Sequence, residues 1–251
     1  MVDIHSHILP GVDDGARTLD ESLQMLHIAA AAGTTDIVAT PHANAQFPYD
    51  HARIQEAYDS LRSKAHGIVN VHLAADFHLS YVNVVDALSN PQKFTINNHQ
   101  YLLVELPDFF SLSVVNDTLQ QLLSSRFVPI ITHPERNVSL HGHRRDIQSW
   151  VDQGVRIQIT AQSLTGRFGP DAKHFADQLL KAKLVHFVAS DAHDCVDRPP
   201  DLSAAYKYIS TVRNRAEADA LFLHNPAATL YGEPLPEPQK KPSKIFRLFS
   251  Q

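Results

Sequence analysis

The sequence contains very little cysteine and no long hydrophobic run. Its one cysteine among 251 residues is Cys195, which excludes an internal disulfide and favours a reducing compartment. No apolar stretch approaches the roughly 20 residues needed to cross a bilayer. The first residues lack the basic and apolar regions of a signal peptide. We therefore expect a soluble, cytoplasmic protein without a transmembrane segment.

An excess of positive charge is also missing. The chain has 22 lysines and arginines against 27 acidic residues, a formal charge of −5, so an electrostatic grip on nucleic acid is not expected. A hydrophobic content of 43% suffices for a sizeable core. The length suits one large α/β domain, which we place at residues 1–232. Residues 233–251 are proline-rich and end in a basic, aromatic peptide, which predicts a flexible tail. The tail is either a frayed end or a peptide that docks on a membrane surface or a partner.

Seven short apolar segments alternate with helical ones. The first predicted strand begins at Val2, and the others cover 36–40, 68–75, 101–104, 128–132, 156–160 and 185–189. Predicted helices run from a capping box at 18–21 to Gly33, and over about 51–66, 112–125, 144–153 and 170–182, with more helix past 202. This alternation predicts repeated βα units and a parallel sheet.

Six of the seven predicted strands carry a metal-ligand type of side chain at or just past the C-terminal end. These side chains are His5, His7, His42, Asp76, Glu105, His133, Asp191 and His193. In an α/β barrel the strand ends converge on one mouth. In an open doubly wound sheet they would spread along a line. The distribution therefore favours a closed barrel with its active site at the C-terminal ends of the strands.

The candidate set is five histidines and four carboxylates once Asp14 is counted. It exceeds one tetrahedral site and suits two or three adjacent divalent ions. Nitrogen and oxygen ligands without thiolate favour manganese, iron or zinc over calcium or copper(I). Asp13 competes with Asp14 as a ligand, and spacing alone does not separate them.

Two arginines follow the candidate ligands closely enough to reach the same mouth. Arg136 lies three residues past His133, and Arg198 lies five past His193. Guanidinium groups suit bidentate phosphate recognition, although each arginine could instead form a surface ion pair. Glu135 is expected either to hold Arg136 or to act directly. Cys195 is not expected to be a nucleophile, because only two residues separate it from Arg198, whereas cysteine phosphatases use a Cys-x5-Arg loop.

Five motifs, in order along the chain, resemble those of the polymerase and histidinol phosphatase (PHP) superfamily. They are Asp-x-His-x-His from Asp3, Thr-Pro-His at 40–42, the acid at 76, His-Pro-Glu-Arg at 133–136 and Ser-Asp-Ala-His at 190–193. The longer stretch at 3–15 is similar to the bacterial tyrosine-phosphatase branch, the CpsB/YwqE type, which acts in capsule and exopolysaccharide synthesis. The likeness extends from Val2 to about Arg198.

The resemblance implies a distorted (β/α)7 barrel of the TIM-like PHP type with a trinuclear, usually manganese-dependent centre. It implies that one ion is held by His5, His7 and Asp191, with Asp76 bridging to a second ion held by Glu105 and His133, and a third held by Asp14, His42 and His193. Arg136 and Arg198 would grip the phosphate of phosphotyrosine. The implied reaction is direct attack by a metal-bound hydroxide, without a covalent enzyme intermediate. The implied substrate is the tail of an autophosphorylating bacterial tyrosine kinase.

One position departs from the family pattern. Asp76 follows Ala74 and Ala75, where the family usually has glutamate. Because aspartate is one methylene shorter, bridging two ions requires the strand end to lie closer to them, and we expect altered metal affinity. Two alternatives remain: a small-molecule phosphomonoesterase such as a histidinol phosphatase, and a non-catalytic module that binds the kinase or an export component through its tail.

Overall fold

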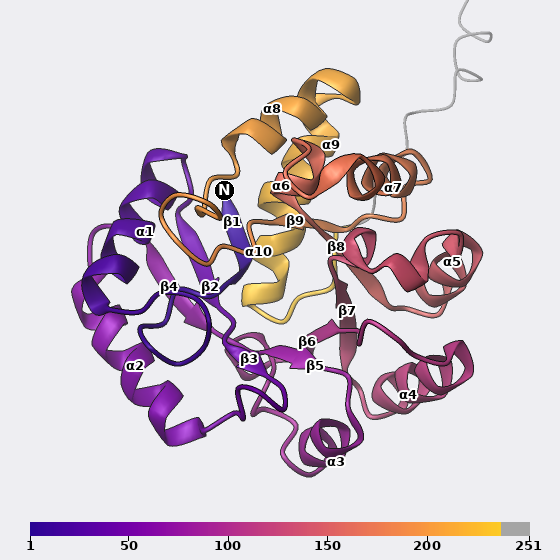
Figure 1. The fold of residues 1–251 in the computed structure, drawn as a ribbon, viewed down its shortest axis with the longest axis horizontal. Coiled ribbons are helices and arrows are strands. Elements are labelled where there is room, and N and C mark those ends of the chain that lie inside the picture. The colour runs from indigo at the N-terminus through magenta and orange to yellow at the C-terminus, as the bar shows by residue number, and fades with distance from the viewer. Residues whose placement is uncertain (237–251) are drawn as a thin grey trace, which may run out of the picture.

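A computed structural model gives the fold and describes residues 1–236. Figure 1 shows strands around the centre of the molecule and helices outside them. The strands are β1 (Val2–Ser6), β2 (Asp36–Ala39), β3 (His42–Ala43), β4 (Asn70–Leu73), β5 (Asp76–His78), β6 (Tyr101–Glu105), β7 (Val128–Thr132), β8 (Arg156–Thr160) and β9 (Phe187–Ala189). The α-helices are α1 (Leu19–Ala31), α2 (His51–Lys64), α3 (Tyr81–Ser89), α4 (Leu112–Ser124), α5 (Arg144–Asp152), α6 (Ala161–Leu164), α7 (Gly169–Lys181), α8 (Ser203–Val212), α9 (Arg215–Asp219) and α10 (Asn225–Leu230). Short helical turns lie at η1 (Ile96–Asn98), η2 (Pro134–Arg136), η3 (Val138–Leu140) and η4 (Ala220–His224).

The strands form two parallel sheets, with the orders β1-β2-β4 and β3-β5-β6-β7-β8-β9. The sheets meet at β1 and β9, where the Asp191 amide donates to the His5 carbonyl at 2.9 Å and the His7 amide donates to the Ala192 carbonyl at 2.8 Å. They meet again where the chain passes from β2 to β3, since the Asp76 amide donates to the Pro41 carbonyl at 3.1 Å. The predicted α/β class with parallel strands is confirmed, and the strand ends share one side of the molecule.

The strand predicted at 68–75 is interrupted in the structure. It is replaced by β4 and β5, because the Ala75 amide between them donates to the carbonyl of Phe94 at 3.1 Å instead of continuing the ladder. Helix α3 was not predicted. It buries Val84 and Ala87 on one face, but Tyr81 and Val82 on the other are 84% and 74% exposed, so the apolar residues of the segment do not show a clear helical period.

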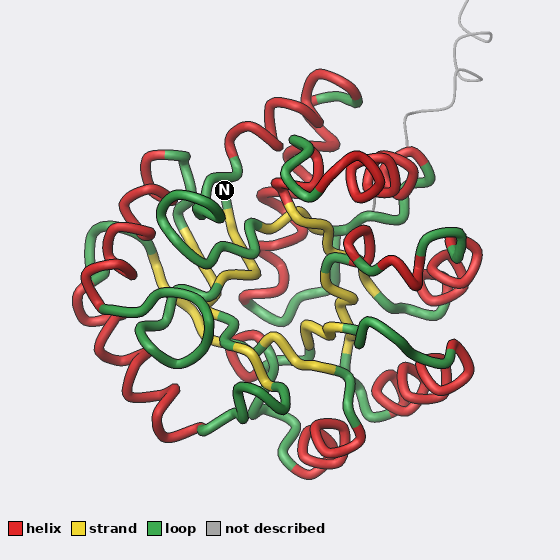
Figure 2. Tube along the Cα trace, in the orientation of Figure 1, coloured by secondary structure: helices red, strands yellow, loops and turns green. Residues whose placement is uncertain are grey.

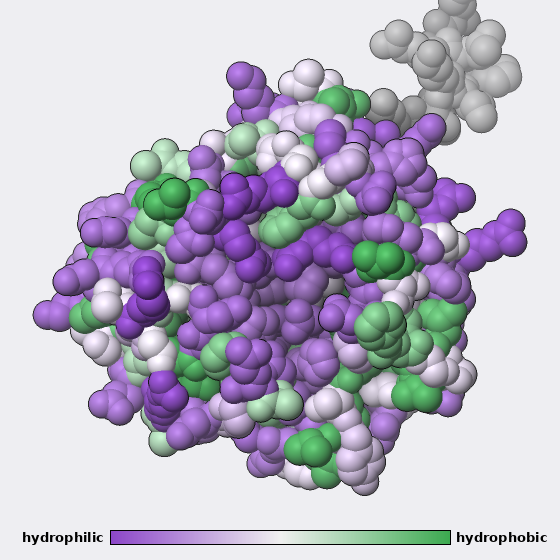
Figure 3. All heavy atoms as spheres, viewed as in Figure 1, coloured by the Kyte–Doolittle hydropathy of each residue, from purple (hydrophilic) through white to green (hydrophobic). Residues whose placement is uncertain are grey.

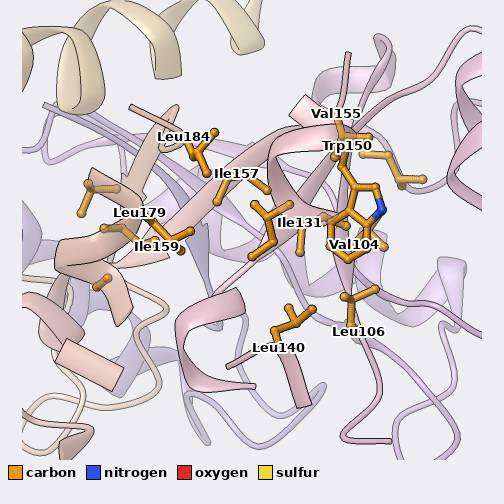
Figure 4. Packing of buried hydrophobic residues seen from close by; sticks show 14 of the residues in the cluster. Val104, Leu106, Ile131, Leu140, Trp150, Val155, Ile157, Ile159, Leu179 and Leu184 are labelled. Carbon is orange, nitrogen blue, oxygen red and sulfur yellow. The ribbon is translucent and has the colours of Figure 1, made fainter. Parts of the chain in front are cut away.

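Both faces of the central strands are buried, which explains their continuous apolar sequences. Leu103 and Ile130 belong to a cluster with Val2 and Ile4 of β1. Their neighbours in the sequence point the other way, because side chains alternate along a strand. Val104 and Ile131 thus join the cluster under the outer helices, where Trp150 of α5 packs (Figure 4). Each such aliphatic side chain contributes about 1.5–3 kcal/mol by burial.

The described chain stays attached to the sheets past α10. The side-chain Nε2 of Gln100 donates to the Gly232 carbonyl at 2.6 Å, and the Tyr101 hydroxyl donates to the Glu233 carbonyl at 2.6 Å. Leu235 packs against the cluster that contains Val2. The basic, aromatic peptide expected at 244–251 lies outside the described residues. Within residues 1–236, no helix is both long and apolar enough to cross a membrane.

Candidate metal and phosphate site

The candidate ligands lie together at the C-terminal ends of the strands. In Figure 2 the loops that follow the strands run across this face, and Figure 3 shows hydrophilic side chains gathered in a hollow at its centre. The candidate ligands form four overlapping groups, and within each group the potential ligand atoms lie within 4.8 Å of one another. The groups are His7, Asp14, His42 and His193; His5, His7 and Asp76; His5, His133 and Asp191; and His42, Asp76 and Glu105. All nine residues predicted as ligands are therefore brought together.

The first two histidines aim at one point. His5 Nε2 and His7 Nε2 are 3.3 Å apart, and Asp191 Oδ1 lies 3.4 Å from each of them. The other nitrogen of His5, Nδ1, is hydrogen-bonded to Oε1 of Gln158 at 2.9 Å. Such a contact fixes a ligating imidazole in orientation and tautomer. Gln158 was not predicted, although a glutamine inside the apolar strand β8 was a usable signal.

The structure separates the two adjacent aspartates, Asp13 and Asp14. Asp13 Oδ2 accepts from His7 Nδ1 at 2.8 Å and from the His42 amide at 3.1 Å, while its Oδ1 accepts from the Gly15 amide at 3.0 Å. It orients His7, and both of its oxygens already accept hydrogen bonds. Asp14 Oδ1 instead lies 3.4 Å and 3.5 Å from Nε2 of His42 and His193, and its side chain is half exposed. The geometry therefore favours Asp14 as the ligand.

Asp76 is a fully buried carboxylate without hydrogen-bond donors. Neither of its oxygens has a hydrogen-bond partner within the described chain, and the same holds for Nδ1 of His42, which lies 3.1 Å from Asp76 Oδ2. Buried polar atoms are almost always paired, so this arrangement fits a bound cation. Glu105 stands nearby, 3.7 Å from His133 Nε2 and 3.5 Å from Nδ1 of His78. His78 belongs to none of the sequence motifs, so its place beside Glu105 was not predicted.

The histidine pKa values follow from burial and from the carboxylates. Burial opposes the charge on His7, but Asp13 and Asp191 outweigh it and raise the pKa of His7 to about 9. Burial likewise opposes the charge on His42, whereas Asp14 and Asp76 raise its pKa to about 11. Burial, helped by Arg136, lowers the pKa of His133 to about 3. Protons on His7 and His42 thus balance the acidic mouth, and a bound cation would replace them.

Both predicted phosphate-binding arginines reach Asp191. Nη1 of Arg136 and Nη2 of Arg198 donate to the same oxygen, Asp191 Oδ2, the latter at 2.6 Å. Burial by itself would raise the pKa of Asp191, but His5, His7 and the two arginines outweigh burial and hold the pKa well below its usual range. Since Oδ1 of Asp191 faces the histidines, this single carboxylate connects the candidate metal cluster with a cationic edge suited to phosphate.

Glu135 does neither of the things expected of it. Its Oε1 accepts from the Thr160 amide at 2.9 Å and from the Ser163 hydroxyl at 2.7 Å, and the side chain is fully buried. It therefore anchors the start of α6 to the turn that carries Arg136, instead of pairing with Arg136 or facing the mouth. Burial raises the pKa of its carboxyl.

The backbone at two ligand positions is left-handed. His133 has φ of 33° and Asp191 has φ of 52°, a conformation that costs a non-glycine residue about 1–2 kcal/mol. In both cases the chain turns sharply as it leaves a strand. Such strain gathers at functional sites. Cys195 lies apart, with its thiol directed at the Glu21 carbonyl at 3.7 Å, and burial raises its pKa, which disfavours a nucleophilic thiolate.

A parallel α/β fold with a histidine and carboxylate cluster at its strand ends, bordered by two arginines, defines a metal-binding enzyme class that acts on anions. The family model described as "Capsular polysaccharide synthesis, CpsB/CapC" matches residues 1–231. The chain belongs to this family, as the resemblance of its motifs had predicted.

Its relatives include tyrosine-protein phosphatases from two bacteria. The chain is 34% identical over 201 residues to "Tyrosine-protein phosphatase YwqE" of Bacillus subtilis, and the matched region covers 79% of each chain. It is 30% identical over 238 residues to "Tyrosine-protein phosphatase CpsB" of Streptococcus agalactiae, covering 92% of this chain and 98% of the relative. A solved structure described as one of YwqE from Bacillus subtilis and CpsB from Streptococcus pneumoniae, "unique metal-dependent tyrosine phosphatases", matches with a TM-score of 0.87 and 30% identity, covering 96% of this chain and all of that one.

Proposed function

We propose that the protein is a metal-dependent tyrosine-protein phosphatase. The observation that carries the proposal is the double role of Asp191, whose Oδ1 faces His5 and His7 while its Oδ2 receives both arginines. A phosphoryl group placed at this carboxylate would contact a metal cluster and two guanidinium groups together. The names of the relatives support tyrosine phosphate as the substrate.

The chain's own residues bind and orient the phosphate. Arg136 and Arg198 offer in-plane N–H donors to phosphoryl oxygens. When bound, divalent ions supply positive charge to the remaining oxygens and lower the pKa of a water molecule that attacks phosphorus. Cys195, the chain's one cysteine, is directed at the Glu21 carbonyl, so we infer a direct displacement without a covalent intermediate on the protein.

We assign all nine clustered residues as ligands of two or three divalent ions. Asp76 belongs to two of the four groups, which supports a bridging role despite its shorter side chain. His7 accompanies Asp14, His42 and His193 in one group, and His133 groups with His5 and Asp191. Oxygen and imidazole ligands without thiolate suit Mn²⁺, with iron or zinc as alternatives.

We also propose that the two sheets act as one distorted seven-stranded barrel. The hydrogen bonds between β1 and the segment after β9 support closure on one side, and those between Pro41 and Asp76 support it on the other. Residues 1–232 would be the catalytic domain and 233–251 a C-terminal tail, either a frayed end or a peptide that docks on a membrane surface or a partner. The capsule family supports a cytoplasmic enzyme whose substrate is the phosphorylated tail of a bacterial tyrosine kinase.

Release of phosphate from a tyrosine-phosphorylated peptide tests the function. We expect turnover with added Mn²⁺ and none after chelation. Histidinol phosphate is the comparison substrate, and faster turnover of that ester would move the protein to the small-molecule phosphatases. Absence of turnover with Mn²⁺, Fe²⁺ or Zn²⁺ on either substrate would refute the enzymatic proposal.

A further inference from the structure

Phe168 is an aromatic residue to which the metal cluster assigns no role. It is half-buried and lies in the turn directly before α7. The guanidinium carbon of Arg136 lies 4.3 Å from the centre of its ring, and that of Arg198 lies 5.8 Å away. One ring thus contacts both arginines of the candidate phosphate site.

The two arginines need support from their surroundings. They are like charges that converge on one oxygen, Asp191 Oδ2, and like charges a few ångströms apart repel each other. A phosphate would have to replace or share that carboxylate contact. Arg198 Nη2 would keep its second contact, with the Asp191 carbonyl at 3.0 Å, whereas the guanidinium of Arg136 would keep the ring of Phe168. An aromatic face attracts a guanidinium group and does not compete for its N–H donors.

The turn that carries Phe168 is tied to both arginine-bearing segments. Arg167 Nη2 donates to Oδ1 of Asp197 at 2.8 Å, which connects the turn with the loop that carries Arg198. On the other side, Glu135 binds the start of α6, just before the turn, and lies next to Arg136 in sequence. Phe168 is therefore held in register with both guanidinium groups.

We propose that Phe168 is a positioning residue for phosphate recognition. This inference rests on the proposed phosphatase function. The ring holds the guanidinium groups of Arg136 and Arg198 side by side through its face, and their in-plane donors stay available to the phosphoryl oxygens. An aliphatic residue of similar size would fill the space without this attraction.

The test compares Phe168→Leu with Phe168→Tyr in the full, manganese-loaded protein. Inorganic phosphate is the probe, its binding is measured by calorimetry, and turnover of a phosphotyrosyl peptide is measured in parallel. We expect Phe168→Leu to weaken phosphate binding and raise KM by about 3- to 30-fold, with a much smaller change in kcat. Phe168→Tyr keeps the ring and should stay close to the wild type. Phe109→Leu removes a ring that is 89% exposed and serves as the matched control.

A second arm shows that the ring acts through the arginines. In an Arg136→Gln background, which removes the guanidinium nearest the ring, the effect of Phe168→Leu on phosphate affinity should shrink clearly, as expected for coupled residues. Manganese content and melting temperature are measured for every variant, which separates a positioning role from damage to the fold. Equal phosphate affinity of Phe168→Leu and wild type, an undiminished effect without Arg136, or a loss in Phe168→Tyr as large as in Phe168→Leu would overturn the inference. If the wild type neither bound nor released phosphate, the proposed function itself would fail.

Discussion

Replacing Asp13 with asparagine tests whether this residue orients a metal ligand without touching the ion. Its two oxygens accept three hydrogen bonds, from His7 Nδ1 at 2.8 Å, from the His42 amide at 3.1 Å and from the Gly15 amide at 3.0 Å. An asparagine has only one acceptor oxygen. In either orientation its amide nitrogen must face an N–H donor, so at least one of these hydrogen bonds is lost.

The expected effect is intermediate in size. Removal of a partner that orients a ligating histidine weakens metal binding by about 10- to 100-fold. The charge of Asp13 also raises the basicity of His7 through their contact, and asparagine loses that contribution. Replacing a ligand itself should cost more. We therefore expect Asp13→Asn to weaken Mn²⁺ binding by about 10- to 100-fold. Asp14→Asn should weaken the binding of one ion by more than this.

The assay is a titration of the metal-free protein with Mn²⁺, in which binding is measured by calorimetry and activity by phosphate release. Asp13→Asn should reach nearly the same stoichiometry as the wild type, but at higher Mn²⁺ concentration. Asp14→Asn should bind fewer ions. If Asp13→Asn lost an ion while Asp14→Asn kept the full number, Asp13 would be the metal ligand and Asp14 would not.

Three further predictions concern charge, space and protonation. Chelation should abolish binding of a phosphotyrosine analogue as well as turnover, because the carboxylates at the mouth repel an anion; tight binding in chelator, measured by calorimetry, would contradict this. Asp76→Glu adds a methylene at a fully buried position and should lower the free energy of unfolding of the metal-free protein by about 1–3 kcal/mol; an unchanged urea midpoint would show spare room. Because burial raises the pKa of Glu135 above its ordinary value of 4.5, folding favours its neutral form, and that stability is lost as the pH rises through the raised pKa. Glu135→Gln should therefore melt at an increasingly higher temperature than the wild type as the pH rises above 4.5; a constant difference would refute this account.

Much of the fold could be predicted because both faces of the strands are buried. The runs at 128–132 and 156–160 are rich in β-branched residues, and β7 and β8 occupy these residues. Helix α1 begins at Leu19, where the predicted cap Thr18 accepts from the Glu21 amide at 3.2 Å. Sequence periodicity could not show the break at Ala75, because that break depends on a contact with Phe94, which is distant in the sequence.

The candidate ligands could be predicted because they follow strands whose ends share one side. Their supporting residues could not be predicted, since support depends on side-chain direction. Gln158 and Phe168 occur in no motif, and their contacts join segments far apart in the sequence. Spacing likewise left Asp13 and Asp14 equivalent, although their side chains point to different partners.

The donors around each buried carboxylate indicate whether it is structural or functional. Asp3, Asp13 and Glu135 are all buried or nearly so, and each accepts at least one backbone N–H. Asp3 Oδ1, for example, accepts from the Ser190 amide at 3.0 Å and joins β1 to the end of β9. Backbone donors fix such groups in place and satisfy them without an ion.

Asp14, Asp76 and Glu105 have a different environment. Within residues 1–236 none of them accepts a backbone N–H, and their neighbours are imidazole nitrogens at 3.1 to 3.9 Å. An unpaired buried polar group costs about 1–3 kcal/mol. Protons on His7 and His42 offset only part of the negative charge of the carboxylates. A cation in the mouth would relieve the unpaired oxygens and nitrogens together. Since a ligand that binds only the folded state stabilises it, a metal held by these residues would also raise the stability of the protein.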